Sequence, residues 1–285
     1  MNVLVLGHGS MGKRHAANAI ALGHAITVYD PAVPELSHLA DDTRAFDAVI
    51  IATPAHLHVD QIARALGNQQ HVFCEKPLAL SVADTAHACL TWDATVTTQV
   101  GYNLRFHPAV QQLKRDLATI GRIRSADLWL RCDMRSWPGT AYASPLLECS
   151  HELDLARCLF GELTVDAAQQ IDPHALELTL RTADWKPIRI SLVTDAGDYQ
   201  RGVRVVGKDA TATYDWHAPS GRTTYRFYDG SPGGNALTTT VMADDTYRAE
   251  VAYFLTCCAA GISATPDFSD GIATLKLCDR IQDIL

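Results

Sequence analysis

Short, mostly apolar segments recur along the first part of the chain, with helical segments between them. Residues 3–6, 25–29 and 48–52 form such runs, which are typical of parallel strands buried on both faces of a sheet. Residues 13–22 and 58–66 have helical spacing. This alternation predicts an α/β fold with a doubly wound parallel sheet, the Rossmann arrangement.

The second half of the chain has a different periodicity. Residues 175–181 and 188–193 alternate apolar with polar or charged side chains, which is the periodicity of strands in a sheet. A length of 285 residues favours two domains. We therefore predict a dinucleotide-binding Rossmann domain at residues 1–118 and a second α/β domain at residues 119–285, which binds substrate and forms oligomer contacts.

Composition and charge restrict the partners and the location that we expect. The chain is 47% hydrophobic and 20% charged, as is ordinary for a globular protein. Its net charge of -8, without clustered lysine and arginine, argues against a nucleic-acid partner. We expect no export signal, since none is visible in the sequence, and no apolar run reaches the roughly 20 residues that cross a membrane. We expect a soluble, cytoplasmic protein with no membrane partner.

Eight cysteines are scattered along the chain without the spacing of metal ligands. Free cysteine is among the residue types that are most often buried. We therefore expect reduced thiols that mostly pack as small hydrophobic side chains, and no bound metal.

A glycine-rich turn joins the first predicted strand to the first predicted helix. We expect Gly7 to permit a tight turn, Gly9 to let the backbone approach a pyrophosphate, and Gly12 to let the helix pack closely. The free N–H groups of the helix N-terminus would then face the phosphates. Alone the pattern is weak, because similar turns join elements that bind nothing. The whole GxGxxG segment reads Gly7-His8-Gly9-Ser10-Met11-Gly12.

Asp30 ends the second predicted strand, near the spacing after the glycines that is expected for an acid on the adenosine ribose. A carboxylate binds both ribose hydroxyls and repels a 2′-phosphate, and no lysine or arginine follows it directly. We therefore predict NAD as the cofactor, in preference to NADP. The alternative is that Asp30 is a solvated turn residue beside Pro31.

The third predicted strand ends at Thr53 and Pro54, so its carboxyl end should face the same cofactor crevice. We count Thr53, Pro54 and the nearby His58 as candidate cofactor contacts. His56 and His58 also suggest metal ligands, but no third ligand is apparent in the sequence. Roles at a helix entry or on the surface are the preferred interpretation of this histidine pair.

A short strand at residues 71–74 leads into Glu75-Lys76-Pro77. With the glycine turn, the aspartate-ended second strand and the Thr-Pro strand end, this motif resembles the glucose-fructose oxidoreductase and inositol dehydrogenase family, called Gfo/Idh/MocA. The resemblance implies a Rossmann domain followed by an α/β domain with a large mixed, mainly antiparallel sheet, and a final helix that can pack back on the first domain. Further matching segments are residues 101–108, 121–123, 147–154, 244–256 and 266–285.

The resemblance also implies residue roles. His151 takes the position of the family's catalytic histidine, and Lys76 would stabilise negative charge on the reacting oxygen and contact substrate and cofactor. Glu75 and Asn103 join the candidate cofactor contacts. Asp154 shares a helix face with His151, where a substrate contact and a helix-face salt bridge are both open.

One position departs from the family pattern. The family usually carries an aspartate four residues before the histidine, where this chain has Leu147. The nearest acid is Glu148, which either replaces that aspartate or leaves the site to work without it. We include Glu148 among the catalytic candidates.

Polar and aromatic side chains near the domain junction and before the catalytic helix are further candidates for contacts with a hydroxyl-rich substrate. Trp137 could equally pack in the core or at a subunit interface. These candidates are Arg105, His107, Trp137 and Tyr142.

Together these roles predict an oxidoreductase that transfers hydride between NAD(H) and a secondary alcohol or ketone of a small-molecule substrate. We expect a sugar, a sugar derivative that includes nucleotide-linked forms, or a cyclitol. Histidine exchanges protons near neutral pH, so His151 would carry the hydroxyl proton. The alternative is a non-catalytic NAD-binding sensor of the same fold, which Leu147 keeps open. Family precedent predicts a homodimer or homotetramer.

Overall fold

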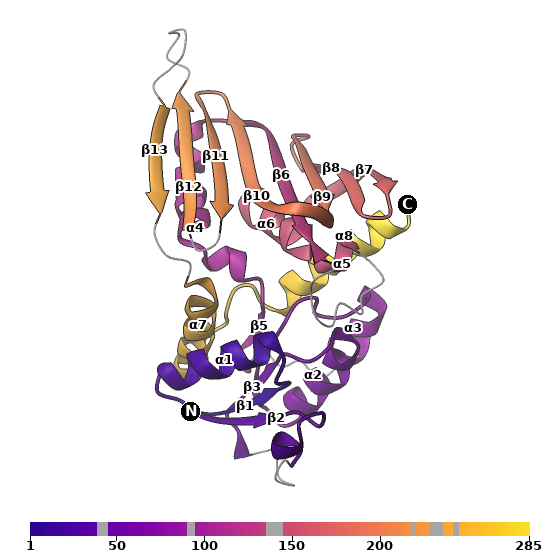
Figure 1. Ribbon diagram of the computed structural model, residues 1–285, viewed down its shortest axis with the longest axis vertical. Helices are drawn as coiled ribbons and strands as arrows, with labels where there is room; N and C mark the ends of the chain where they lie inside the picture. The colour runs from indigo at the N-terminus through magenta and orange to yellow at the C-terminus, as the bar shows by residue number, and fades with distance from the viewer. Residues whose placement is uncertain (39–44, 90–94, 135–144, 218–219, 228–235, 242–244) are drawn as a thin grey trace. The chain divides into compact units, whose positions relative to one another are not determined.

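The computed structural model describes residues 1–38, 45–89, 95–134, 145–217, 220–227, 236–241 and 245–285. They form two compact units (Figure 1). The first unit contains residues 1–103 and 246–276, and the second contains residues 104–245 and 277–285.

The first unit contains a parallel sheet of five strands in the order β2-β1-β3-β4-β5. This order is that of a doubly wound sheet, as the apolar runs predicted. The strands are β1 (Asn2–Leu6), β2 (Ala25–Tyr29), β3 (Ala48–Ile51), β4 (His71–Cys74) and β5 (Thr98–Val100). The helices are α1 (Ser10–Ala21), α2 (His58–Gly67), α3 (Val82–Cys89) and α7 (Thr246–Ala260), with 3-10 turns η1 (Pro34–Leu36), η3 (Ala55–Leu57) and η4 (Asn103–Phe106), the last of which runs into the second unit.

Helices cover both faces of this sheet. Val3, Val5 and Ile50 share one apolar cluster with Val251 and Phe254, so α1 and α7 cover their face. Successive residues of a strand point to opposite faces, and the residues between these are buried as well. The helix α2, which contacts β3, β4 and α3, accounts for burial on the other face.

Backbone hydrogen bonds continue past the ends of the strands along the carboxyl edge of this sheet. In each bond, a residue just beyond one strand donates its N–H group to the last carbonyl of the neighbouring strand. The segments that follow β1 to β4 therefore begin side by side at one edge. The bonds are Gly7 to Tyr29 (2.8 Å), Ala52 to Leu6 (2.8 Å), Glu75 to Ile51 (2.9 Å) and Gly101 to Cys74 (2.8 Å).

The second unit contains a mixed sheet of eight strands in the order β13-β12-β11-β10-β6-β9-β8-β7. The neighbours β6 and β9 are parallel and the other pairs are antiparallel. The strands are β6 (Ile123–Asp133), β7 (Leu163–Asp172), β8 (Ala175–Thr182), β9 (Pro187–Val193), β10 (Asp195–Gly207), β11 (Ala210–His217), β12 (Ser220–Phe227) and β13 (Ala236–Val241). The helices are α4 (Pro108–Ile120), α5 (Pro145–Glu148) and α6 (Ser150–Phe160), and α8 (Phe268–Gln282) ends in this unit.

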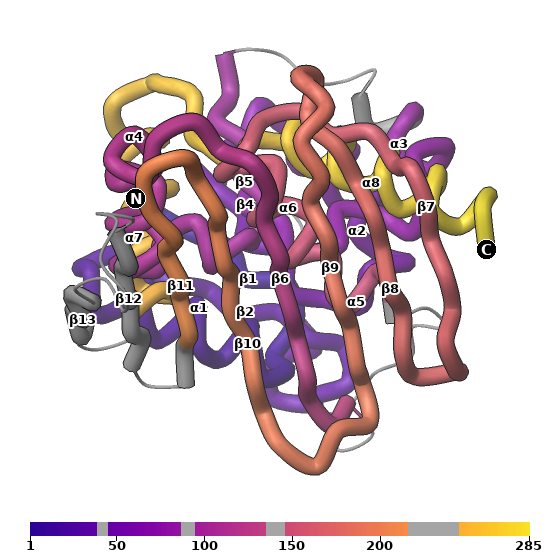
Figure 2. Tube along the Cα trace, turned by 90° about the horizontal axis from the view of Figure 1, so that it is seen from above, coloured from indigo at the N-terminus to yellow at the C-terminus, as the bar shows by residue number. Residues whose placement is uncertain are grey.

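In the eight-stranded sheet, the strands β6, β8 and β9 alternate buried side chains with more exposed ones. Figure 2 shows the strands β8, β9, β6 and β10 side by side. Leu176, Leu178 and Leu180 of β8 are buried in one apolar core, whereas Glu177 is exposed and bonds Ser191 of β9. The alternation in residues 175–181 and 188–193 thus correctly predicted strands of a sheet.

The division into units differs from the predicted domains 1–118 and 119–285. The helix α4 belongs to the second unit, since Ala109, Val110 and Leu113 lie in its apolar core. The helix α7 belongs to the first unit. A boundary drawn at one point along the chain cannot represent a unit made of two separate segments.

Cysteine burial agrees with the expectation from the sequence. Of the seven cysteines whose side chains the structure describes, all are free thiols and six are buried. Burial raises the pKa of Cys132 to about 11 and that of Cys278 to about 12. These thiols therefore remain protonated near neutral pH and pack as apolar groups.

The longest helices of the described chain, α7 and α8, contain 15 residues each. In this part of the chain, no helix is both long and apolar enough to span a bilayer.

Candidate functional site

The glycine turn after β1 has the backbone geometry of a tight strand-to-helix turn. Gly7 has a φ of +95°, and a Cβ atom there would lie 2.6 Å from the Ala52 carbonyl oxygen. A Cβ atom on Gly12 would lie 2.0 Å from the Gly7 carbonyl oxygen. Both positions require glycine, as the sequence predicted. A Cβ atom on Gly9 would meet nothing within 4 Å, so this side of the turn is open.

The N-terminus of α1 follows directly from this turn. Gly9 is the N-cap, no side chain caps the helix, and the first turn carries no acidic residue. The first N–H groups of a helix lack partners within the helix, and the helix dipole favours an anion beside them. This end of α1 therefore has the properties that a pyrophosphate requires.

The Asp30 carboxylate is held against the glycine turn. Its Oδ2 atom accepts a hydrogen bond from the His8 N–H group at 2.8 Å, and Oδ1 accepts one from the Ala32 N–H group at 2.9 Å. The bond from Ala32 is the kind expected of a turn residue, the alternative role for Asp30. The bond from His8 connects the carboxylate to the GxGxxG segment. Each carboxylate oxygen can accept a further hydrogen bond from a ribose hydroxyl.

His58 connects the ends of β3 and β4. Its side chain is buried, with Nδ1 2.9 Å from the Pro77 carbonyl oxygen and Nε2 2.8 Å from the Thr53 carbonyl oxygen. Burial lowers the pKa of the imidazole, although the two carbonyl groups act in the opposite direction. His58 thus lies between two strand ends, with each ring nitrogen next to a protein carbonyl group, and its cofactor contact stays a prediction. Pro54 is exposed, and Thr53 donates its hydroxyl to Gln61.

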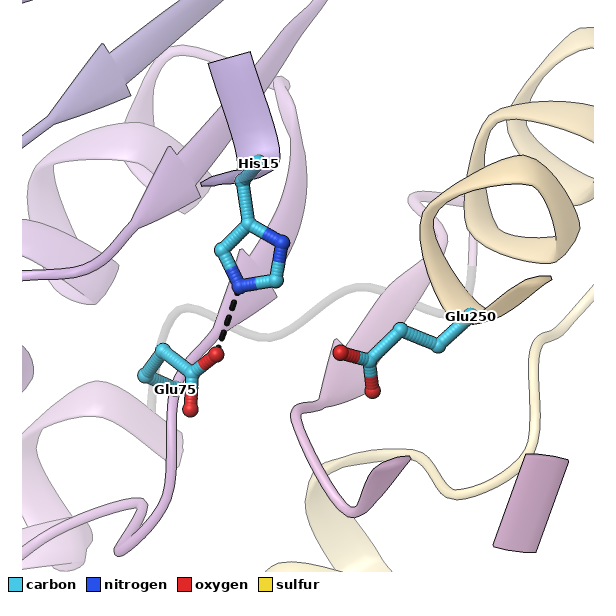
Figure 3. Close-up of side chains that lie close together, drawn as sticks. All are labelled: His15, Glu75 and Glu250. Carbon is cyan, nitrogen blue, oxygen red and sulfur yellow. Dashed lines mark hydrogen bonds and ion pairs between the residues drawn. The ribbon is translucent and has the colours of Figure 1, made fainter. Parts of the chain in front are cut away.

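Glu75 holds the turn that carries Lys76. His15 of α1 donates from Nε2 to the Glu75 Oε1 atom at 2.6 Å (Figure 3). The Lys76 N–H group donates to Oε2 at 3.3 Å. Both carboxylate oxygens thus have a partner within the protein, and the cofactor contact of Glu75 stays a prediction. Lys76 itself is half-buried, and Asn103 is buried.

Two residues near this turn were missed from the sequence. His15 and Glu250 are fully buried, and Figure 3 shows the Glu250 carboxylate of α7 pointing toward His15 and Glu75. Burial raises the pKa of Glu250 well above its usual value, the negative charge of Glu75 adds to this, and Arg14 opposes it. The side chains that they face come from distant parts of the sequence, so a local motif does not reveal them.

In the second unit, Glu148 ends α5 and His151 lies in the first turn of α6. Glu148 is buried and His151 is half-buried. Leu147, at the position of the family's usual aspartate, packs against the apolar core of this unit. The departure noted in the sequence is therefore a hydrophobic contact, and Glu148 is the acid next to it.

Arg105 and Asp154 form a buried, two-pronged ion pair. The Arg105 Nε and Nη2 atoms donate to the two Asp154 oxygens at 2.8 and 2.6 Å. Their side chains are 8% and 1% exposed. Of the two alternatives left open for Asp154, the structure shows the salt bridge, although its partner is Arg105 and not a residue of its own helix.

The remaining substrate candidates separate into two groups. His107 is buried and caps α4: its Nδ1 atom accepts the Ala109 N–H group at 3.2 Å and lies 2.6 Å from the Tyr214 hydroxyl. This histidine has a structural role. Trp137 and Tyr142 lie outside the described residues.

The chain matches the GFO_IDH_MocA family model, described as an oxidoreductase family with an NAD-binding Rossmann fold, over residues 18–102. Two relatives are inositol 2-dehydrogenases. The protein from Rhizobium meliloti is 27% identical over 96% of this chain and 94% of its own length. The inositol 2-dehydrogenase 2 from Mycolicibacterium vanbaalenii is 30% identical over 74% of this chain and 72% of its own length.

A third relative and a solved structure extend the comparison. A protein from Haloferax volcanii, named D-xylose 1-dehydrogenase (NADP(+)) 2, is 26% identical over 86% of this chain and 79% of its own length. Levoglucosan dehydrogenase, solved with NADH and levoglucosan, superposes with a TM-score of 0.87 at 20% identity, over 99% of this chain and 96% of its own. The latter likeness shows a shared fold.

We predict that Arg105→Met destabilises the protein by about 3–5 kcal/mol, because it leaves the Asp154 carboxylate buried without a counter-charge. The control is Arg189→Met, which breaks the exposed pair with Asp127 (2.6 Å) and should cost about 0–1 kcal/mol. Urea unfolding of both variants measures the difference. Equal losses in the two variants would contradict the assigned role of the buried pair.

Proposed function

The chain belongs to the Gfo/Idh/MocA family of oxidoreductases with an NAD(P)-binding Rossmann fold, and we propose that it transfers hydride between NAD and a secondary alcohol or ketone of a sugar, sugar derivative or cyclitol. The observation that carries the proposal is the set of groups at one sheet edge in the first unit: an open helix N-terminus, the Asp30 carboxylate and the Lys76 turn. The relatives' names, inositol and xylose dehydrogenases, support the substrate class.

We assign NAD on the chemistry of Asp30. Its carboxylate lies against the GxGxxG turn, at the His8 N–H group, where a 2′-phosphate would meet a negative charge. Pro31 and Ala32 follow it, so the next two positions offer no cation to neutralise such a phosphate. Asn103, Thr53 and Pro54 remain proposed contacts of the cofactor.

The bound nicotinamide supplies the hydride acceptor or donor. We assign proton transfer with the substrate hydroxyl to His151, since histidine gains and loses protons near neutral pH. Lys76 stabilises negative charge on the reacting oxygen, a role that suits an ammonium group on a turn fixed by its own backbone. Glu148 is the acid that we propose in place of the family's aspartate, because it is buried and adjoins Leu147.

Arg105 and Asp154 act on substrate indirectly in this proposal. Since each satisfies the other's charge, neither offers an unpaired charge for a substrate hydroxyl. We propose that they fix α6, on which His151 lies, relative to the segment at Arg105.

One observation favours a second function. The apolar packing of Leu147 removes an acid that the family usually carries, as would suit a sensor that binds NAD without catalysis. The retention of Lys76 and His151 favours the enzyme, so the test of function is turnover.

We predict that Lys76→Ala and His151→Asn each lower turnover at least about 100-fold, because each removes a group from proton transfer or charge stabilisation. Their affinity for NADH should be unchanged. The assay follows nicotinamide absorbance with a panel that includes inositol, levoglucosan and D-xylose. The exposed lysine variant Lys208→Ala is the control, and undiminished turnover in both test variants would reject the assigned roles.

We predict that Asp30→Ser reduces the preference for NAD over NADP at least about tenfold, since the serine hydroxyl has no charge to repel a 2′-phosphate or strengthen ribose binding. Titration of each cofactor by intrinsic fluorescence measures the ratio. Asp60→Ser, an exposed acid in α2, is the control and should leave the ratio unchanged. Equal affinity of the unaltered protein for both cofactors would contradict the NAD assignment.

We also propose that the protein forms a homodimer or homotetramer through the solvated face of its eight-stranded sheet. Light scattering should give a mass of two or four chains. A mass of one chain at micromolar concentration would contradict this.

A further inference from the structure

Three buried ionisable side chains meet inside the first unit. His15 and Glu250 are 0% exposed and Glu75 is 8% exposed. One ring nitrogen of His15 and one carboxylate oxygen of each glutamate lie within 4.8 Å of one another. The elements that bring them together are α1, the end of β4 and α7 (Figure 3).

Glu250 has no hydrogen-bond partner for either carboxylate oxygen among the described residues, and its carboxylate points at the His15 and Glu75 pair. The His15 Nδ1 atom also has no partner there. An ionised carboxylate buried without a donor is costly, and the cost increases when a second carboxylate faces it. A proton on one of the two acids removes most of this cost.

Arg14 also carries a charge near Glu250, but it does not make the protonation of Glu250 unnecessary. Arg14 of α1 stacks over the Tyr247 ring, 4.2 Å from its centroid. Gln99 of β5 is neutral and donates to the Glu250 backbone carbonyl at 3.3 Å. Burial and the charge of Glu75 together raise the pKa of Glu250 against the effect of Arg14.

Glu75 has little freedom to move. Its Oε1 atom accepts from His15 and its Oε2 atom accepts from the Lys76 backbone. A Cβ atom on Gly101 would lie only 3.0 Å from Oε2, so the carboxylate packs directly on that backbone. A change in the charge or position of Glu75 is therefore transmitted to the Lys76 turn.

We propose that His15 and Glu250 are positioning residues for Lys76: Glu250 holds a proton, so that Glu75 stays bonded to His15 and fixed against the turn that carries Lys76. The effect on turnover rests on the proposed function of Lys76. The buried proton is a property of the first unit alone. The same three side chains have the chemistry of metal ligands, and a bound metal would replace this proton.

The test of the buried proton is Glu250→Gln, which replaces a protonated carboxyl group by a neutral group of the same shape. A carboxyl group whose pKa is raised on folding stabilises the protein at low pH, and this stability is lost as pH rises through the folded pKa. The melting temperature of Glu250→Gln relative to the unaltered protein should therefore increase as pH rises above about 4.5. Glu35→Gln, an exposed acid of the same unit, should show no such trend.

The test of positioning uses His15. His15→Ala should lower kcat about 10- to 100-fold without changing the KM for NAD, because Lys76 is misplaced but the cofactor turn is intact. His15→Gln, which keeps a donor toward Glu75, should restore most of kcat. Glu250→Gln should keep its kcat at neutral pH and extend the active range to higher pH.

The outcomes test the buried proton, the positioning of Lys76 and the proposed function separately. Parallel melting curves for Glu250→Gln and the unaltered protein across pH, or one zinc per chain by elemental analysis, would overturn the buried proton. If Glu250→Gln fails to fold, the infrared carbonyl stretch of a protonated carboxylic acid in the unaltered protein at neutral pH decides instead, and its absence overturns the proposal. If the substrate panel shows no turnover, the proposed function fails, while the melting curves still test the proton. Normal kcat in His15→Ala would overturn positioning.

Discussion

Parallel strands deliver their carboxyl ends to one edge of a sheet, and the functional part of the first unit depends on this constraint. The ladder of backbone bonds from Gly7 to Gly101 continues past the strand ends. The segments after the strands consequently lie next to one another at this edge. They carry the glycine turn, Asp30, Thr53 and Lys76, which are dispersed over the first third of the chain. Their proximity is a consequence of topology and does not depend on direct contacts between their side chains.

Many of the polar residues around these motifs are engaged by the protein itself. His58 bonds two carbonyl groups, Glu75 bonds His15, and Arg105 bonds Asp154. Each of these groups would be costly to bury unpaired. Within each unit they hold a segment in place: Glu75 holds the turn that carries Lys76, and Asp154 ties the helix that carries His151 to Arg105.

The sequence predicted the fold well because its signals are local. Apolar runs and glycine spacing depend on neighbours along the chain, and the predicted strands and the Gly7 and Gly12 turn are present in the structure. The roles of His58, His107 and Glu75 were not predictable in this way. Their partners are brought by other elements, as in the bond between His15 and Glu75, 60 residues apart. A motif reveals that a residue is special, but only its packing shows whether it faces a ligand or the protein.

The return of α7 to the first sheet affects how the protein is made. Val251, Phe254 and Leu255 share one apolar core with Val3 and Val5. A ribosome makes the chain from its N-terminus, so one face of the Rossmann sheet lacks part of its cover until almost the whole polypeptide has emerged. During synthesis, that exposed face is a surface for chaperones to shield, and a chain truncated before residue 246 would keep it exposed.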